Sequence, residues 1–325
     1  MQSNKVRFRR PFLPDEDGFD GYFKYCLRKL DPKSSTGLGA FSKFATIGDV
    51  LGWNGVVFTE VCRVEELKAF VVERLRTLER RVLDRNGAYP RAEAEADQRF
   101  PGAEEEREES STRFALEGNK AADPIKLFIK DEPHSRKKVA ENRFRLIHCL
   151  GLVDQMVDKI LYTPWYEAEL RDPMSCSQKT GWSPLPGGYQ RLQRDFPEDQ
   201  SIAVDKACWD WTMPFWVVEA YVSLKLHQME REGDDVHWDR YWALAWERLF
   251  FVLGPGTRFR LSGGLELRQQ FWGVMKSGWL LTLSMNSAAQ AFQHVLACWR
   301  LGWADKAQHT LWAMGDDLLA KMKLT

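Results

Sequence analysis

The stretch AMGDDLLA, at residues 313–320, predicts a tight hairpin that carries two acidic side chains at its tip. Apolar residues flank the acids on both sides, in TLWAM before them and in LLAKMKL after them, and this pattern favours two paired strands. Gly315 suits a tight turn because glycine adopts backbone conformations that other residues avoid. Asp316 and Asp317 would repel each other at a rigid tip, so the hairpin favours a hard divalent cation bound through oxygen atoms.

A second Gly-Asp-Asp occurs at residues 233–235, and chance alone accounts for about 0.1 copies in a chain with 23 glycines. This copy lies among charged residues in MEREGDDVHW, where no apolar strands would hold two carboxylates still. We interpret it as a solvated turn between two helices. Context, rather than the tripeptide itself, therefore favours the copy at residues 315–317 as the functional one.

A third carboxylate follows a short apolar stretch, SIAVD, at residues 201–205. This stretch predicts a strand, and Asp205 would leave the core at its end. Together with Asp316, Asp205 would hold two Mg²⁺ ions about 3.5–4 Å apart, the arrangement that serves nucleotidyl transfer. Mn²⁺ is an alternative ion. A helix N-cap is the other interpretation of Asp205 taken alone.

Between these acids, the sequence KSGWLLTLSMNSAAQ carries small polar residues at steps of about four. We predict one long helix over residues 278–300, opened by a Ser-Gly pair, with these polar groups on one face. Next to carboxylates, such a face would hydrogen-bond a sugar or a nucleic-acid backbone, although polar helix faces more often contact only solvent. The residues concerned are Ser277, Gly278, Thr282, Asn286 and Ser287.

The remaining patterns mix helices with short strands, which predicts an α+β fold. Residues 91–112 are strongly acidic and almost free of apolar residues, so we interpret them as a solvated connector. Pro164 is expected to bend or interrupt its helix. Residues up to about 60 show no sustained period. The other predicted elements are a helix near 63–85 with apolar Leu67, Phe70, Val71, Leu75, Leu78 and Val82, a strand in PIKLFIK, helices in VDQMVDKILYTPWYEAEL, at 213–230 and in HWDRYWALAWERLFFVL, and a hairpin in RFRLSGGLELRQ.

The formal net charge is zero, so no global basic field indicates nucleic acid, but a local basic channel would suffice. Residues 126–145 are a candidate, with seven Lys and Arg against three acids. The six scattered cysteines show no metal-binding spacing, and we interpret them as reduced thiols in a cytosolic compartment. The N-terminus lacks the apolar stretch of a signal peptide, and no apolar run approaches about 18 residues, so no transmembrane segment is expected.

Taken together, these residues resemble the motifs of a known family, the viral RNA-dependent RNA polymerases. D-x4-D (Asp205, Asp210), S-G-x3-T-x3-N-S (from Ser277) and G-D-D (from Gly315) resemble its motifs A, B and C, in that order. FIKDEPHSRKKVAENRFRLI resembles motif F of positive-strand RNA viruses. The combination of KDEP, RLI, VDQ and WDW is most similar to the sobemovirus and luteovirus-like polymerases. The resemblance covers about residues 126–325, and the first Gly-Asp-Asp does not fit it because it precedes motif B.

The resemblance implies the fingers and palm of a right-hand polymerase, with an antiparallel palm sheet packed on helices. Residues 1–120 would form an N-terminal region associated with the fingers, 121–200 the fingers with motif F, and 201–325 the palm with a fingers insertion near 220–275. Motifs D and E and a helical thumb do not follow the last Gly-Asp-Asp before Thr325, so the thumb is expected to be missing.

The resemblance also implies a role for each matched residue. Asp205 and Asp316 would ligate the catalytic Mg²⁺ ions, with Asp317 beside them. Asp210 and Asn286 would sense the ribose 2′-OH of the incoming NTP. Reverse transcriptases carry a bulky aromatic residue where Asp210 stands, which favours RNA as the product. The residues that would shape the ribose pocket are Ser277, Gly278 and Thr282, and those that would hold the triphosphate in an entry channel are Lys130, Arg143 and Arg145.

We therefore predict an RNA-directed RNA polymerase that adds NMPs to an RNA 3′-OH during viral genome replication. Its expected partners are an RNA template, a primer or nascent strand, NTPs and other viral replication proteins, in the host cell cytoplasm or at replication sites on membranes. The alternative is a truncated, inactive fragment that serves only as an RNA-binding or scaffold module. A calcium-binding protein is disfavoured because the D-x-D-x-D-G spacing of a calcium loop is absent from the sequence.

Overall fold

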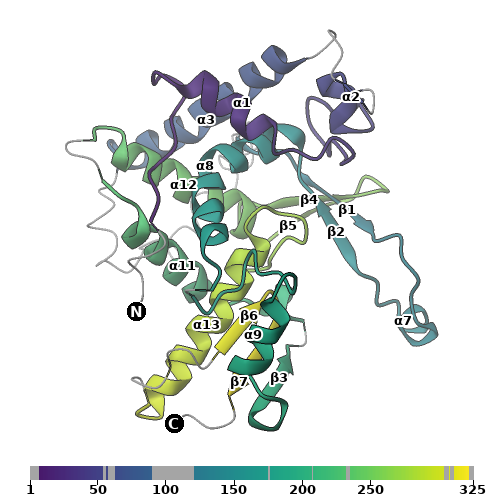
Figure 1. Ribbon diagram of the computed structural model, residues 1–325. Coiled ribbons are helices and arrows are strands. Elements are labelled where there is room, and N and C mark those ends of the chain that lie inside the picture. The colour runs from purple at the N-terminus through teal and green to yellow at the C-terminus, as the bar shows by residue number, and fades with distance from the viewer. Residues whose placement is uncertain are drawn as a thin grey trace.

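The computed structural model describes residues 7–53, 56–57, 63–89, 121–174, 176–206, 208–231, 235–303, 307 and 311–321. It has a helical body, a projecting β arm, and a small sheet at the end of the body opposite the N-terminal helices (Figure 1). This mixture of helices and sheets confirms the predicted α+β class. The predicted acidic connector at 91–112 lies outside the described residues. Within the described part, no helix is long and apolar enough to cross a membrane.

The helical body encloses one continuous hydrophobic core. Helices α1, α3 and α12 all contact α8, whose Met156 and Trp165 are fully buried. The predicted helix near 63–85 is confirmed as α3, and its predicted apolar face is buried except for Phe70, which is partly exposed and packs edge-on against Phe41. The helices of the body are α1 Phe19–Leu27, α2 Ile47–Leu51, α3 Val64–Asn86, α8 Leu152–Arg171, α11 Phe215–Gln228 and α12 Trp238–Leu253.

Two short helices of the body were not predicted. Helix α1 buries Phe19, Phe23 and Cys26, which stand at helical spacing within only nine residues. Helix α2 has five residues and depends on a capping box, in which the side chains of Thr46 and Asp49 hydrogen-bond each other's backbone. Segments this short lack the repeated period on which the prediction depended.

Pro164 does not interrupt its helix. Helix α8 runs from residue 152 to 171 with Pro164 inside it. Most of its residues are buried by the neighbouring helices, so tertiary packing outweighs the backbone hydrogen bond that proline removes.

Buried charges join α8 to its neighbours. Arg248 of α12 is almost fully buried and donates to both carboxylate oxygens of Asp158, at 2.7 and 3.1 Å, and to Asp154 at 3.0 Å. Arg74 of α3 donates to Asp154 at 2.9 Å and to Asp123, just before β1, at 3.3 Å. This network ties α3, α8 and α12 to the base of the arm.

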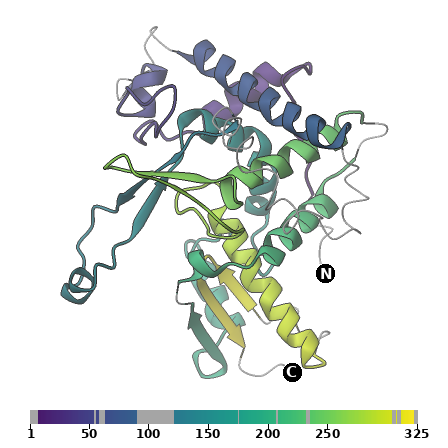
Figure 2. The same ribbon diagram turned by 180° about the vertical axis from the view of Figure 1, so that it is seen from behind.

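The first sheet forms the base of the arm. Its strand order is β2-β1-β4-β5, in which β1 runs antiparallel to β2 and parallel to β4. Beyond the sheet, the β1–β2 connection extends away from the body and carries α7 at its tip (Figures 1 and 2). The strand predicted in PIKLFIK and the predicted hairpin in RFRLSGGLELRQ are confirmed. The elements are β1 Ile125–Ile129, α7 Arg136–Ala140, β2 Leu146–Cys149, β4 Arg258–Leu261 and β5 Glu266–Arg268.

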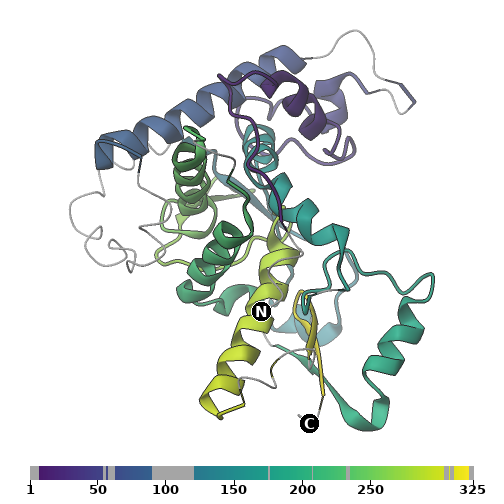
Figure 3. The same cartoon turned by 60° about the vertical axis from the view of Figure 1, so that its left-hand side comes forward.

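The second sheet is antiparallel and has the order β3-β7-β6. Helix α13 runs alongside it and contacts β6 (Figure 3). Along the edge of β6 that faces away from β7, the backbone N–H of Lys179 donates to the carbonyl of Ala313 at 2.9 Å. The N–H of Ala313 donates to the carbonyl of Ser177, also at 2.9 Å. The elements here are α9 Gly188–Asp195, η2 Glu198–Gln200, β3 Ser201–Asp205, α10 Trp209–Thr212, α13 Thr282–Arg300, β6 Leu311–Met314 and β7 Asp317–Lys321.

The strand predicted to end at Asp205 is confirmed as β3, an edge strand whose Ile202 and Val204 are exposed. One prediction about this region is wrong. The long helix begins at Thr282 rather than at residue 278, because Gly278 has a φ of 104°, which no right-handed helix allows. Ser277 and Gly278 therefore lie in a loop and not on the helix.

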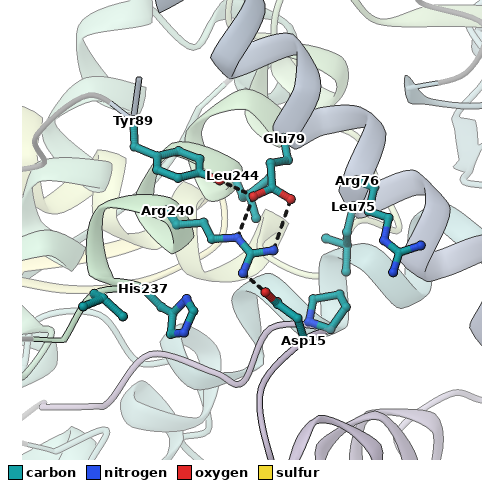
Figure 4. A pocket seen from close by; sticks show the side chains of 10 residues that line it. Asp15, Leu75, Arg76, Glu79, Tyr89, His237, Arg240 and Leu244 are labelled. Carbon is teal, nitrogen blue, oxygen red and sulfur yellow. Dashed lines mark hydrogen bonds and ion pairs between the residues drawn. The ribbon is translucent and has the colours of Figure 1, made fainter. Parts of the chain in front are cut away.

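A pocket of about 510 Å³ opens between α3, α12 and the segment before α1 (Figure 4). Three of its charged side chains are paired, since Arg240 donates to both carboxylate oxygens of Glu79, at 2.7 and 3.1 Å, and to Asp15 at 2.6 Å. Tyr89 also hydrogen-bonds Glu79. These contacts hold the N-terminal segment on the helical body, away from the acidic hairpin (Figure 1).

Replacing Arg248 by Met would leave Asp158 buried without its cation. We expect the free energy of unfolding, measured by urea denaturation, to fall by about 3–5 kcal/mol. The matched control is Arg80→Met, because Arg80 makes an exposed pair with Glu73 at 2.6 Å. That change should cost about 0–1 kcal/mol. Similar losses in the two variants would contradict the claim that the buried network stabilises the fold more than an exposed ion pair does.

Candidate active site

The acidic hairpin has a two-residue connection. Only Gly315 and Asp316 lie between β6 and β7. Gly315 has a φ of 70°, the left-handed conformation that such turns favour and that glycine adopts at little cost. Its N–H donates to the hydroxyl of Ser287 at 2.9 Å, and the side-chain amide of Gln290 donates to the carbonyl of Asp316 at 2.9 Å. Both partners belong to α13, so the turn is fastened to that helix.

Asp205 is the last residue of β3 and lies directly opposite Asp317, the first residue of β7. Opposed residues of antiparallel strands point to the same face of a sheet. Both carboxylates therefore leave the sheet on one side, next to the turn that carries Asp316. All three residues are exposed. The register thus brings the three predicted carboxylates to one end of the second sheet.

These carboxylates offer a cation only oxygen ligands. Among the described residues, no three His, Cys, Asp or Glu side chains are close enough to form a metal site as they stand. The donor set of Asp205, Asp316 and Asp317 nevertheless fits a hard divalent cation, because Mg²⁺ binds through one or two carboxylates and keeps part of its water. Exposed side chains on a fixed backbone can rotate towards such an ion, and the fold does not have to change.

Asp210 lies on the short helix α10 and faces α13. Its carboxylate accepts a hydrogen bond of 2.7 Å from the side-chain amide of Asn286, and its carbonyl accepts the N–H of Met275 at 2.7 Å. Burial raises the pKa of Asp210, and the charge of Asp316 raises it further, while the bond from Asn286 and the charge of Arg145 oppose this rise. Asp210 is therefore within electrostatic reach of both the acidic turn and the arm.

Asn286 is only 4% exposed, and only one of the two polar atoms of its side-chain amide is hydrogen-bonded within the described part of the chain. Its Nδ2 donates to Asp210, whereas its Oδ1 has no hydrogen-bond partner among the residues that the structure describes. A buried acceptor without a partner costs about 1–3 kcal/mol. This oxygen is itself buried, so only a group that enters beside Asp210 could pair with it.

Three further predicted residues shape the loop before α13. The hydroxyl of Thr282 donates to the carbonyl of Lys276 at 2.7 Å and so closes the loop. The carbonyl of Ser277 accepts the N–H of His148, on β2, at 3.2 Å. A Cβ at Gly278 would lie 3.0 Å from the carbonyl oxygen of His148, so glycine lets β2 approach closely. These contacts join the loop to the arm.

Lys130 and Arg145 are neighbours on the arm, since the N–H of Lys130 donates to the carbonyl of Arg145 at 2.8 Å. Both side chains contact Glu132, at 2.6 and 3.3 Å respectively, and they lower the pKa of that carboxyl. Arg143 lies closer to α7 and pairs with Glu141 at 2.7 Å. Exposed ion pairs of this kind are weak, so a more highly charged anion would compete for the cations.

The first Gly-Asp-Asp was predicted to be a solvated turn, and the one residue of it that the structure describes does not fit that prediction. Gly233 and Asp234 lie outside the described residues, but Asp235 is partly buried and binds Arg10 through both carboxylate oxygens. Arg10 also donates to both carboxylate oxygens of Glu16, at 2.7 Å each. Asp235 therefore has a structural role, because it fastens the N-terminal segment to the corner before α12.

Sequence reasoning did not reveal what Ser287 and Gln290 do. Both are fully buried and bind the acidic turn. They stand three residues apart on α13, a spacing that places them on one helix face. Their spacing implies that they share one helix face, but only the packing of α13 against β6 shows that this face contacts the acidic turn.

Known proteins with similar sequences are viral. Residues 84–187 match the family model described as viral RNA-directed RNA-polymerase. The chain is 30% identical to Replicase polyprotein P2AB of Cocksfoot mottle virus over 211 residues, which cover 59% of this chain and 21% of that protein. It is 29% identical to Protein P1-P2 of Potato leafroll virus over 217 residues, 61% of this chain and 18% of that protein. It is also 29% identical to the RNA-directed RNA polymerase of Mushroom bacilliform virus over 213 residues, 64% of this chain and 49% of that protein.

The chain is similar in sequence to viral RNA-directed RNA polymerases. The predicted similarity to the sobemovirus and luteovirus-like group is confirmed. The aligned part spans about a fifth of the length of the first relatives, 21% in Cocksfoot mottle virus and 21% in Southern bean mosaic virus. The match to the family model includes the arm and α8 but ends before Asp205. It therefore shows similarity in this region and assigns no role to the acidic residues.

Replacing Ser287 by Ala removes the acceptor for the buried N–H of Gly315. We expect the free energy of unfolding to fall by about 1–3 kcal/mol, because a buried donor is left without a partner. Urea unfolding followed by tryptophan fluorescence measures the change. The control is Thr212→Ala, which removes an exposed hydroxyl that donates to the carbonyl of Cys208 at 3.2 Å and should change stability by less than about 0.5 kcal/mol. Equal effects would contradict the anchoring role of Ser287.

Proposed function

We propose that this chain carries the fingers and palm of an RNA-directed RNA polymerase, which transfers an NMP from an NTP to the 3′-OH of an RNA on an RNA template. The observation that carries the proposal is the bond between Asp210 and Asn286 beside the charge of Asp316. It offers hydrogen-bond acceptors for a ribose next to carboxylates that suit a cation. The relationship to viral polymerases supports the class of reaction.

Asp210 and Asn286 would read the 2′-OH of the incoming nucleotide. The unpartnered Oδ1 of Asn286 would accept a hydrogen bond from this hydroxyl, while Nδ2 keeps the carboxylate of Asp210 in place. A site built to bond a hydroxyl rejects an analogue that lacks it, because the buried acceptor is then left unpaired. Ser277, Gly278 and Thr282 would hold the wall of this pocket through the loop before α13.

Asp205, Asp316 and Asp317 would hold the divalent cations, two Mg²⁺ ions with Mn²⁺ as an alternative. When bound, such ions neutralise the transferring phosphate and activate the attacking hydroxyl. The chain itself supplies fixed positions for the carboxylates. Ser287 and Gln290 hold the turn, and the pairing of β3 with β7 holds Asp205 beside it.

Lys130, Arg143 and Arg145 would bind the triphosphate. The half-buried Glu132 pairs with two of these cations, and a triphosphate carries enough negative charge to displace it. A guanidinium fork also matches phosphate oxygens better than a single charge does. With its phosphates on the arm and its ribose at Asp210, the nucleotide would be oriented for attack, and such positioning supplies much of a polymerase's rate.

The partners and location follow from the same proposal. The chain would bind an RNA template, a primer or nascent strand and NTPs, together with other viral replication proteins. It would act in the host cell cytoplasm or at replication sites on membranes. Residues 121–200 would form the fingers and 201–325 the palm, with a fingers insertion near 220–275, while 1–120 would be associated with the fingers.

A second candidate is an RNA-binding or scaffold module without catalytic activity. The exposed Ile202 and Val204 on the edge strand β3 favour it, because an open apolar edge suits association with another polypeptide. A primer-extension assay with a parallel RNA-binding measurement separates the two candidates. Binding without incorporation by the 325-residue chain would support the module.

Replacing either Asp205 or Asp316 by Ala should reduce Mg²⁺-dependent nucleotide incorporation by more than about 100-fold. The physical reason is the loss of a carboxylate that the cations need. Primer extension on an RNA template measures the rate, with the chain alone and with a longer polymerase that contains it. Asp234→Ala in the other Gly-Asp-Asp is the matched control and should leave the rate nearly intact. Equal loss in both tripeptides would overturn the assignment.

Replacing Asn286 by Ala should lower the preference for ATP over dATP by about 10- to 100-fold, because the acceptor for the 2′-OH is removed. The ratio of kcat/KM values for the two nucleotides measures the preference. Gln193→Ala on α9, an exposed amide, is the control and should leave the ratio unchanged. A lower rate with an unchanged ratio would show that Asn286 acts only through the fold.

A further inference from the structure

Helix α10 carries two tryptophans in opposite environments, one on each side of Asp210. Trp209 is 6% exposed, and the ammonium of Lys206 lies 4.3 Å from its ring centroid. Trp211 is 54% exposed, although indole is one of the largest apolar groups in proteins. Packing in the core accounts for the presence of Trp209, but it does not account for Trp211, because about half of that side chain is exposed.

Exposure alone does not distinguish Trp211, since Trp299 on α13 is 67% exposed. The position of Trp211 does distinguish it from Trp299. The ring centroid of Trp211 lies 6.4 Å from that of His148, on the strand that directly follows Arg145. The preceding residue is Asp210, whose pKa is raised by burial and by the charge of Asp316 in the acidic turn. Trp211 therefore stands where the arm meets the acidic end of the second sheet.

The backbone that carries Trp211 is firmly held. The carbonyl of Asp210 accepts the N–H of Met275 at 2.7 Å. A Cβ at Gly273 would lie only 2.2 Å from the carbonyl oxygen of Met213, so the loop before α13 packs directly against the end of α10. A ring on such a support is preorganised, and it loses little entropy when a ligand binds.

The neighbour of Trp211 adds no charge. His148 is 5% exposed, and burial together with the charge of Lys276 lowers its pKa to about 4. Its imidazole is therefore neutral at neutral pH. The exposed indole, with this neutral ring beside it, therefore suits a flat, uncharged group rather than a phosphate.

We infer that Trp211 is a stacking surface for the base of the nucleotide whose ribose lies against Asp210 and Asn286, an inference that rests on the proposed function. Consecutive side chains on a helix point in different directions, and the Trp211 ring points towards His148 on β2. A base is bonded directly to its ribose, so the base of a ribose at Asp210 would meet the indole where the base extends towards β2. Stacking suits a template-directed enzyme because every base has a π face, and one aromatic ring therefore accepts all four.

Isothermal titration of the 325-residue chain with ATP, UTP and inorganic tripolyphosphate, each with Mg²⁺, tests this inference. In Trp211→Ala the dissociation constant for ATP should rise by about 5- to 150-fold. The larger purine should lose more affinity than UTP, and tripolyphosphate, which has no base, should bind unchanged. Trp211→Phe should retain most of the affinity for both nucleotides, and Trp299→Ala should retain all of it.

An unchanged affinity for ATP in Trp211→Ala would overturn the stacking role and leave the proposed function standing. An equal loss for ATP and tripolyphosphate would also overturn it, since a base contact cannot act on a ligand without a base. If the unsubstituted chain binds neither ATP nor UTP, the proposed function fails, and the stacking role fails with it.

Discussion

The buried guanidinium of Arg248 holds together the parts of the molecule that support the candidate site. It binds Asp154 and Asp158 of α8, and Arg74 continues the network from α3 to Asp123 at the base of the arm. These charges are compensated only while the helices keep their positions, and a buried charge without its partner costs several kcal/mol. The arm therefore starts from a fixed point on the helical body, although its outer part extends into solvent.

A second buried contact connects the far end of α8 to the acidic turn. Glu169 accepts a hydrogen bond of 2.7 Å from Ser284 of α13 and forms an ion pair with the fully buried Lys225 of α11. Ser284 lies three residues before Ser287, which binds the turn. One short part of α13 thus contacts the body on one side and the turn on the other. The second sheet, which is small and partly exposed, takes its position from this helix.

Elements with a long repeated period could be predicted, because the period reports which face of a helix is buried. Helix α3 and the helix at HWDRYWALAWERLFFVL are examples. Helices α1 and α2 could not, since each is too short for a period to appear. The start of α13 was misplaced because the positive φ of Gly278 depends on the close approach of β2. The role of Asp235 was hidden for a similar reason, because its partner Arg10 lies 225 positions away.

The sequence by itself determined the acidic turn, the strand that ends at Asp205, the polar residues before and on α13, and the similarity to viral polymerases. These follow from local chemistry: glycine permits the turn, and apolar residues around it favour strands. Only the tertiary structure decided which groups meet. The opposition of Asp205 and Asp317 is a matter of strand register, and the bond between Asn286 and Asp210 joins residues 76 positions apart. Such contacts depend on how distant segments pack, which no local pattern in the chain specifies.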